Sequence, residues 1–541
     1  MAPKTFTKDE VASHKDPSGS GLWIIVDNEV YDLTKFADEH PGGKKILLRN
    51  AGTDASKPFW KYHNQAILNK YKAKLHIGSV GGGAIGVTPA TSYAAPMPSG
   101  SKSTPVQDDE AEIQYFGDMN PYADPSWYQG WHSPYYKPHH HALRAEIREF
   151  VETEIEPFVH EWDEAKGMPN TIYEKMGQRG WLAGCLGVKY PTKYTDVRCK
   201  SVPPEKWDHF CELVITDELS RCGSGGVVWN LLGGYGIGCP PVLKFGNEEV
   251  KKRILPDVLS GKKRFCLCIT EPDAGSDVAN LVTSAKKTAD GKHYIVNGEK
   301  KWITNGLLSD YFTVAVRTGG PGMNGISLLL IEKTMPGVTT RQMKCQGVWA
   351  SGTTYVEFDD VKVPVENLIG KENKGFKVIM TNFNHERIGI IIQANRFARV
   401  CYEEAFKYAQ KRKTFGKKLI EHPVIRDKFA NMARQIEATH ANLELVIYQM
   451  EKMGDVEAML RLGGAVAGLK AQSTKVFELC AREASQVFGG LSYSRGGQGD
   501  KVERLYRDVR AYAIPGGSEE IMQDLMMRQG MKVAQALGAK F

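Results

Sequence analysis

The spacing of apolar residues changes twice along the chain. Between residues 139 and 265 apolar residues recur every three to four positions, as in HALRAEIREFVETEIEPFV and HFCELVITDEL, which predicts amphipathic helices. From residue 266 to 365 the pattern becomes short alternating runs separated by glycine, such as HYIVNG, YFTVAV, ISLLLIE and TYVEFDDVKV, which is typical of strands. After Lys371 long helical patterns return. We therefore expect helices, then a β-domain, then helices again.

A stretch with neither pattern separates the first 78 residues from the rest. Residues 79–110 include fourteen Gly, Pro or Ser among 32, which predicts a flexible linker with a reach of roughly 30 Å; an ordered path along a domain surface is the alternative. The predicted organisation is a domain at 1–78, a linker at 79–112, a helical domain at 113–265, a β-domain at 266–370 and a C-terminal helical domain at 371–541.

The composition limits the classes of protein to which the chain can belong. With 541 residues, 42% of them hydrophobic and 25% charged, it is globular and multidomain, and it has no run of 18 apolar residues that would span a membrane. A net charge of +7 without a basic block argues against a nucleic-acid partner. The ten cysteines form no CxxC pair, so we expect reduced thiols inside a cell.

The two ends of the chain bear on its location. The start, MAPKTFTKDEVASHKD, has neither an apolar signal-peptide run nor the composition of a mitochondrial presequence. The last three residues, AKF at 539–541, are only similar to a peroxisomal address. We expect a cytoplasmic or peroxisomal protein.

Two histidines in the N-terminal domain predict a haem site. His40 lies in DEHPGGKKIL, where a Pro-Gly-Gly turn leaves no bulky side chain beside it, and His63 lies in FWKYHNQAI. Two imidazoles on opposite faces of a porphyrin hold haem iron. Residues 5–78 resemble cytochrome b5, which implies haem b held by His40 and His63. A b5-like fold that has lost its haem is the alternative, but it would be expected to lack at least one of these ligands.

Five motifs carry the candidate chemistry of the large part. LCITEPDAGSD at 267–277 offers hydroxyl donors around a glycine, although alone it could be an ordinary turn, and NGEKKWITNG places Trp302 to stack on a planar ring. YAQKRKTFGKKL, SQVFGGLSYSR and VERLYRDVRAYAIPGGSEEIM follow in that order. Together these motifs, over about residues 140–530, resemble the acyl-CoA dehydrogenase family.

The family resemblance implies a fold, a cofactor and the residues that hold it. The implied α+β multidomain fold is a small α+β cytochrome b5-like domain, then a helical domain, a β-barrel domain and a C-terminal helical bundle, in a homotetramer or homodimer. FAD would lie between barrel and helices. Its flavin end or pyrophosphate would contact Thr270, Ser276, Trp302 and Thr304, and its adenine side, across a subunit interface, would contact Arg412, Thr414, Phe415, Gln486, Gly489 and Gly490. Leu267, Ile269, Gly275, Ile303, Ser518 and Glu520 complete the expected cofactor-binding set.

The catalytic base departs from the usual family pattern. Family chemistry removes the α-proton of an acyl thioester with a carboxylate, and Gly516 stands where most members carry that Glu. Glu386 lies three residues after Phe383 and four before Ile390, so it projects from the apolar stripe of a helix, where a carboxylate is costly unless it is paired or functional. A minority of the family, including long-chain and isovaleryl-type enzymes, is similar to this arrangement. We expect Glu386 to be the base and the Gly516 N–H to hold the thioester oxygen; a structural pairing of Glu386 with a neighbouring Arg or Lys is the alternative.

The resemblance also suggests a substrate and an electron route. Ser276, Asn384 and Arg387 match positions near the CoA moiety, although the family often has Asp where Asn384 stands. Branched or long acyl chains would fit a base placed on the helix. The tethered haem would receive electrons from the flavin, replacing or supplementing an external electron acceptor.

Other functions and one more motif stay open at this stage. An oxidase acting on acyl-CoA or nitroalkanes, or a flavin-bearing binding protein without catalysis, would use the same scaffold. The run HHH at 139–141 suggests a metal site, but three adjacent histidines cannot converge on one ion from a helix start. We therefore expect the run at the surface, with metal binding as the alternative.

Overall fold

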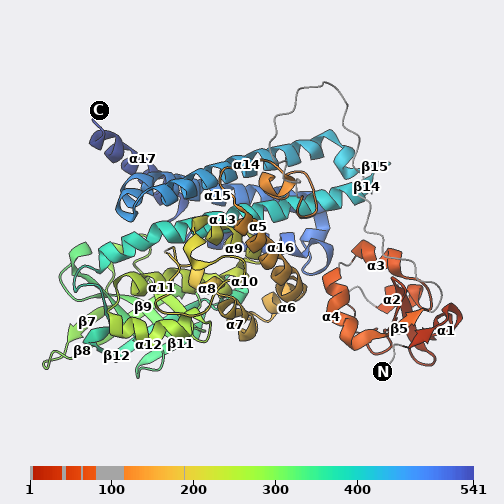
Figure 1. The fold of residues 1–541 in the computed structure, drawn as a ribbon, viewed down its shortest axis with the longest axis horizontal. Helices are drawn as coiled ribbons and strands as arrows, with labels where there is room; N and C mark the ends of the chain where they lie inside the picture. Colours follow the sequence, from red (N-terminus) through yellow and green to blue (C-terminus); the bar gives the residue numbers. More distant parts are fainter. Residues whose placement is uncertain are drawn as a thin grey trace. The chain divides into compact units, whose positions relative to one another are not determined.

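The computed structural model describes residues 4–38, 40, 44–62, 65–80, 115–187 and 189–540. The chain divides into two compact units, with the boundary between Tyr115 and Phe116 (Figure 1). Of the expected linker at 79–112, only residues 79 and 80 are described, at the end of a strand, and the rest lies outside the described residues. None of the described helices combines the length and apolar character that crossing a bilayer requires.

In the described part of the N-terminal unit, a five-stranded sheet packs with four helices. Strand order is β1-β5-β4-β3-β2, and β1 pairs with β5 in parallel. Asp27 and Asn28 both have positive φ, which is the backbone of a two-residue type I′ turn and sets the β3–β4 register. The elements are β1 (Thr5–Phe6), α1 (Lys8–Ala12), β2 (Lys15–Asp16), β3 (Gly21–Val26), β4 (Glu29–Asp32), α2 (Lys44–Asn50), α3 (Ser56–Tyr62), α4 (Gln65–Leu75) and β5 (His76–Val80).

Helices form the first part of the large unit, as the spacing predicts. The segment HALRAEIREFVETEIEPFV is not one regular helix: α5 ends at Phe150, and a π turn at Val151–Ile155 and a 3-10 turn at Glu156–Phe158 follow, where Pro157 has no N–H to continue the ladder. The helices are α5 (Pro138–Phe150), α6 (Val159–Glu164), α7 (Asn170–Gln178), α8 (Trp181–Gly184), α9 (His209–Ser220), α10 (Gly225–Val228), α11 (Gly234–Phe245) and α12 (Glu248–Leu259).

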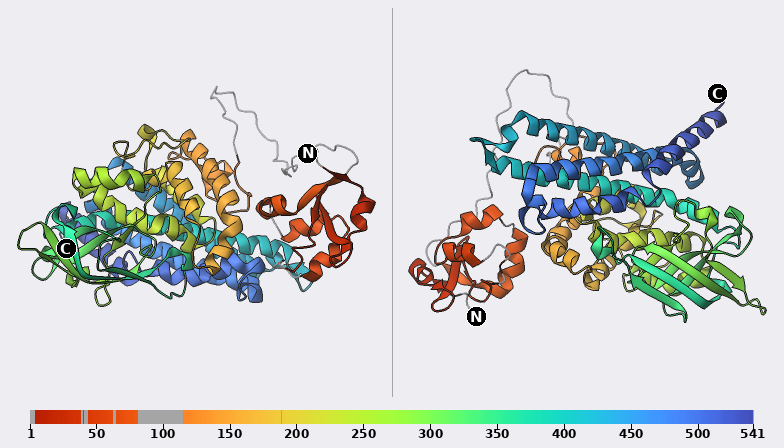
Figure 2. Two further views of the ribbon diagram at one scale, coloured as in Figure 1. Left: turned by 90° about the horizontal axis from the view of Figure 1, so that it is seen from below. Right: turned by 180° about the vertical axis from the view of Figure 1, so that it is seen from behind.

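The expected β-domain is an eight-stranded, mainly antiparallel sheet around its own apolar core (Figure 2). The hydrogen-bonded order is β11-β12-β8-β7-β9-β10-β13, and β6 pairs with β9. The link between β7 and β9 is a single pair, Ser284 with Arg317. The strands are β6 (Phe265–Cys268), β7 (Ser284–Lys287), β8 (His293–Ile303), β9 (Tyr311–Arg317), β10 (Ile326–Glu332), β11 (Val338–Gln342), β12 (Thr354–Pro364) and β13 (Leu368–Ile369).

Three long helices dominate the C-terminal part (Figures 1 and 2). Short connections make α13, α14 and α15 alternate in direction, so the C-terminal ends of α13 and α15 meet, where the rings of Tyr408 and Phe488 stack with centroids 4.6 Å apart. The elements are α13 (Gly375–Lys411), β14 (Lys413–Thr414), β15 (Lys417–Lys418), α14 (Pro423–Lys452), α15 (Asp455–Phe488), α16 (Asp500–Ala513) and α17 (Glu519–Ala536).

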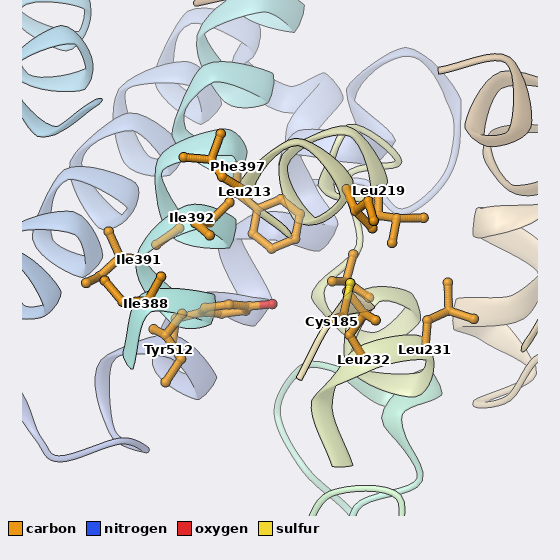
Figure 3. Packing of buried hydrophobic residues seen from close by; sticks show 14 of the residues in the cluster. Cys185, Leu213, Leu219, Leu231, Leu232, Ile388, Ile391, Ile392, Phe397 and Tyr512 are labelled. Atoms are coloured by element: carbon orange, nitrogen blue, oxygen red, sulfur yellow. The ribbon is translucent and has the colours of Figure 1, made fainter. Parts of the chain in front are cut away.

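Helix α13 is fixed in rotation by apolar and charged contacts. Figure 3 shows Ile388, Ile391 and Phe397 of α13 in a buried cluster with Leu213 of α9 and Tyr512 of α16. The fully buried Arg396 guanidinium donates to Asp124 Oδ1 at 2.9 Å and to Asp217 Oδ2 at 2.9 Å. Because a buried ion pair is costly to break, these contacts set the directions of the other α13 side chains.

Candidate active site

Glu386 on α13 lies beside Gly516, although 130 residues separate them in the sequence. A methyl group on Gly516 would lie 3.9 Å from Glu386 Oε1 and 2.8 Å from Ile390 Cδ1. The Glu386 side chain is half-buried, and burial raises its pKa, although the neighbouring charges of Arg387 and Lys470 oppose that rise. A carboxyl group with a raised pKa becomes a stronger base once it is ionised. The arrangement can therefore remove a proton from a group bound next to Gly516.

Arg387 attaches α13 to the same loop. Its Nε donates to the Gly516 carbonyl oxygen at 2.9 Å, and its Nη1 donates to Asn384 Oδ1 at 3.4 Å. The structure thus brings Asn384 and Arg387 together at the Glu386 site. Ser276, the third expected CoA contact, is exposed in the connection after β6. Part of the role of Arg387 is to hold the Gly516 backbone.

Lys470 is a site residue that sequence reasoning missed. It is fully buried on α15, and its Nζ donates to the carbonyl oxygens of Ala513 and Gly517 at 2.8 and 2.7 Å, on either side of Gly516. Burial lowers the pKa of Lys470 to about 8, against the opposing effect of Glu519 and Glu386. The available signal was a lone lysine in the run of small and apolar residues GGAVAGLKA.

Gln393 on α13 is another residue that the sequence did not single out, and it connects α13 to the π turn at Trp229–Gly233. Gln393, two turns after Glu386, accepts hydrogen bonds at Oε1 from Trp229 Nε1 at 3.1 Å and from the Tyr512 hydroxyl at 2.8 Å. A methyl group on Gly233, at the end of this turn, would lie 3.1 Å from Thr304 Cγ2. The turn therefore contacts Gln393 of α13 through Trp229 and Thr304 through Gly233.

Trp302 has the features of a ring that receives a planar group. It is bulky yet has φ 58°, and its side chain is 51% exposed. A bulky residue in the left-handed region is strained, and such strain concentrates at functional positions. The Thr270 carbonyl accepts from the Lys301 N–H at 2.9 Å, which joins the first predicted motif to the second.

The other expected residues near Trp302 differ in exposure. Ile269 and Ile303 are buried, Leu267, Thr270 and Thr304 are half-buried, and Gly275 and Ser276 are exposed. No neighbouring atom lies within 4 Å of a methyl group placed on Gly275, so a ligand can approach the backbone closely there. The exposed Trp302 ring and this open backbone fit the edge of a flavin.

A second group of expected cofactor residues lies at the far end of α13. Phe415, at the tip of the β14–β15 hairpin, is 96% exposed, and the Tyr408–Phe488 stack brings this hairpin to the end of α15. Arg412, Thr414, Gln486, Gly489 and Gly490 lie in the same region. Arg412 follows Glu386 by 26 residues, about 39 Å along a helix. Within one chain the Phe415 group therefore lies far along α13 from the Glu386 site.

Ser518 and Glu520 lie with the Glu386 group. Ser518 is the N-cap of α17, and its Oγ accepts from the Ile521 N–H at 3.5 Å. Hydrogen bonds from its own backbone N–H and from Ser518 lower the pKa of the exposed Glu520. Helix α17 thus begins directly after the Gly516 loop.

The haem site is described in part. His40 lies with its ring centroid 5.9 Å from that of Phe36, which belongs to the apolar core of the N-terminal unit. His63 lies outside the described residues. The pairing of His40 with His63 as iron ligands therefore stays a prediction.

The expectation that the HHH run lies at the surface is wrong for its middle residue. His140 is fully buried, because its Nδ1 accepts from the Lys137 N–H at 2.9 Å and its Nε2 pairs with Asp208 Oδ1 at 2.9 Å. The partner that buries it is 68 residues away, so the local run gave no sign of it.

Comparisons with known proteins match both units. Models of the acyl-CoA dehydrogenase N-terminal, middle and C-terminal domains match residues 137–262, 266–361 and 373–531, and a cytochrome b5-like haem/steroid binding domain matches residues 7–81.

Individual proteins agree with these domain matches. The acyl-CoA dehydrogenase apdG of Emericella nidulans is 43% identical over 423 residues, which cover 77% of this chain and 96% of that protein. The crystal structure of acyl-CoA dehydrogenase from Geobacillus kaustophilus has a TM-score of 0.66 and 32% identity, covering 74% of this chain and 99% of that one. An acyl-CoA dehydrogenase complexed with FAD from Bacillus anthracis has a TM-score of 0.67 and 26% identity, covering 75% and 68%.

Proposed function

Because the chain belongs to the acyl-CoA dehydrogenase family and carries a cytochrome b5-like domain ahead of it, we propose that it oxidises an acyl-CoA thioester between Cα and Cβ with Glu386 as the base. The observation that carries this proposal is the position of the Glu386 carboxylate beside Gly516, the residue that replaces the usual family base. The products are an enoyl-CoA, one proton on Glu386 and one hydride equivalent.

Each residue of the site has a role in this reaction. Bound FAD would supply a hydride acceptor, and haem b held by His40 and His63 would supply a one-electron acceptor. The Glu386 carboxylate takes the α-proton, and the Gly516 N–H donates to the thioester oxygen, where negative charge develops. Arg387 and Lys470 hold the carbonyl groups at and after Gly516, which keeps that N–H in place. Asn384, Arg387 and Ser276 are proposed to contact CoA.

FAD binding is proposed to need two copies of the chain. The Phe415 group lies beyond the C-terminal end of α13, far along that helix from Glu386, so this group would serve the FAD of a neighbouring subunit. A homodimer or homotetramer supplies this arrangement. The exposed rings of Trp302 and Phe415 are the features of the structure that fit the cofactor.

The N-terminal domain is proposed to be the electron exit. The predicted flexible linker, of which only residues 79 and 80 are described, would give the haem an effective concentration of about millimolar relative to the flavin, so transfer would not require a separate encounter. An external electron acceptor would then be served by the haem. A cytoplasmic or peroxisomal location is part of the proposal; Phe541 of the C-terminal tripeptide lies outside the described residues.

Anaerobic addition of an acyl-CoA to the full-length protein is expected to bleach the flavin and then reduce the haem within minutes. Both cofactors absorb visible light, so stopped-flow spectra follow them separately. His40→Ala removes a predicted iron ligand and should abolish the haem signal, whereas His76→Ala, which breaks an ion pair with Glu29 in the same domain, should keep it. If the flavin is bleached while the haem stays oxidised, the haem is not the electron acceptor of the flavin. That result would leave the proposed acyl-CoA reaction unaffected.

Gly516→Ala is expected to slow flavin reduction at least about tenfold. An L-residue at φ 68° costs about 1–2 kcal/mol, and the new methyl group would lie 2.8 Å from Ile390 Cδ1, beside the carboxylate. Gly291→Ala is the matched control, because Gly291 has φ 69° with no atom within 4 Å of an added methyl group. Gly291→Ala should lower Tm by a similar or smaller amount and leave the rate unchanged. Equal rates for the two variants would contradict the role of the Gly516 backbone.

A further inference from the structure

We propose that His139, Asp208 and Cys211 form a binding site for a divalent transition metal such as Zn²⁺. One candidate ligand atom from each of these residues and from His140 lies within 4.8 Å of all the others. An imidazole nitrogen, a carboxylate oxygen and a thiolate sulfur are the donors that protein zinc sites use. The three residues come from the start of α5 and the start of α9, so the fold brings them together rather than the sequence.

The hydrogen bonds of His140 show that its ring holds the Asp208 carboxylate in place and is not itself a proposed metal ligand. Because its Nδ1 accepts from the Lys137 N–H, the neutral ring carries its proton on Nε2, which donates to Asp208 Oδ1 at 2.9 Å. The same oxygen accepts from the Cys211 N–H at 3.1 Å as the N-cap of α9. These two hydrogen bonds hold Asp208 in one orientation through Oδ1, and Oδ2 is the oxygen proposed to bind the metal. A ligating carboxylate in metalloproteins is commonly held by such outer hydrogen bonds.

His139 supplies an independent sign of a missing partner. Its Nε2 atom is buried, and it has no hydrogen-bond partner in the protein. Most buried polar atoms are paired, so an orphan ring nitrogen requires an explanation. A metal ion shared with Asp208 and with the buried Cys211 sulfur, which would bind as the thiolate after releasing its proton to water, would satisfy it.

A cavity beside the cluster gives an ion space to approach. It has a volume of about 540 Å³, and His139 and Asp208 are among its lining residues. Glu205 and Glu451 also line it, together with Lys137 and Lys206, so its charge does not exclude a cation.

The proposed metal has a structural consequence. Three protein ligands leave one tetrahedral position for water, and the bound ion would cross-link the first turn of α5 to the first turn of α9. The ion would bind the folded chain better than the unfolded chain, because the ligands come from separate elements, so it should raise Tm.

Titration of the full-length, FAD- and haem-loaded protein with ZnCl₂ after EDTA treatment and dialysis tests the site. We expect one zinc per chain by elemental analysis, counted apart from haem iron, and a Tm that rises with zinc. His139→Ala should weaken zinc binding at least tenfold. His141→Ala removes the next histidine of the same run, which packs on Trp127, and should bind zinc as the parent chain does.

Two outcomes would overturn the proposal. One is no zinc retained above the level of a buffer control, and the other is zinc bound equally by the parent chain, His139→Ala and Asp208→Asn, which places the ion elsewhere. Cys211 is fully buried, so Cys211→Ser can fail to fold, whereas His139 is only half-buried and its variant decides the question.

Discussion

Glu386→Gln should slow acyl-CoA-dependent flavin reduction by about 10³-fold or more while FAD stays bound. Gln is close in size to Glu but cannot accept the α-proton, and Glu386 is the residue whose carboxylate oxygen lies 3.9 Å from a methyl group placed on Gly516. Stopped-flow absorbance under anaerobic conditions measures the rate, and the flavin-to-protein ratio measures cofactor retention. A matched control is Glu372→Gln, which removes a carboxylate that pairs with Lys287 just before the same helix. The control should react as the parent chain does.

The stability of Glu386→Gln separates a lost base from a damaged fold. Burial raises the pKa of Glu386, so between the ordinary carboxyl pKa and this raised value the folded chain binds more protons than the unfolded chain. The parent protein therefore loses stability as pH rises through that window. Glu386→Gln does not titrate and should unfold at no lower temperature than the parent at pH 8. A variant that is slow and also markedly less stable would not support the assignment, and a variant with near-normal rates would contradict it.

Lys470→Met is expected to slow flavin reduction about tenfold or more and to move the acid side of the pH–rate profile to higher pH. Met matches the length of Lys but leaves the Ala513 and Gly517 carbonyl groups without their donor, and losing a charged hydrogen bond costs about 1.5–3 kcal/mol. Removing the positive charge also raises the pKa of Glu386, which must be ionised to act. The pH dependence of the reduction rate measures both effects.

Two further variants distinguish positioning from general damage. Lys470→Arg keeps the positive charge and should leave the acid side of the profile near its parent position, even if packing slows the reaction. Lys475→Met removes an exposed lysine one turn further along α15 and should change neither rate nor profile. The other charged groups that act on Glu386 or Lys470 are unchanged in every variant, namely Arg387, His385, Glu519 and Glu520. A Lys470→Met profile that is lower but not shifted would leave Lys470 with a structural role only.

The spacing of apolar residues predicted the order of helices and strands, because this spacing depends only on residues that are close in the sequence. The change from three-to-four spacing to alternation located the β-domain, and the apolar stripe around Glu386 predicted a helix that α13 confirms. Two departures in the sequence, a missing carboxylate in one motif and an added one in another, suggested Glu386 as the base. The structure places Glu386 beside Gly516, and its role as the base stays a prediction. These inferences needed no knowledge of distant contacts.

The remaining features depend on contacts that the sequence does not display. Lys470 is an ordinary helix residue by propensity, and only the carbonyl groups of Ala513 and Gly517, more than 40 residues away, explain its burial. His140 is buried by Asp208 on another helix. The π turn at Trp229–Gly233 has a sequence compatible with a regular helix, and its contacts with Gln393 of α13 and with Thr304 come from distant parts of the chain.

The central claim is α,β-dehydrogenation of an acyl thioester, and a single-turnover reaction with α-deuterated acyl-CoA thioesters tests it most directly. The full-length protein is mixed anaerobically with a panel of straight and branched acyl chains, and the products are analysed by mass spectrometry. For at least one of the acyl-CoA thioesters, we predict that the flavin is bleached, that enoyl-CoA forms in proportion to flavin, and that one α-deuterium is lost. Recovery of every thioester intact, with the flavin still oxidised, would contradict it.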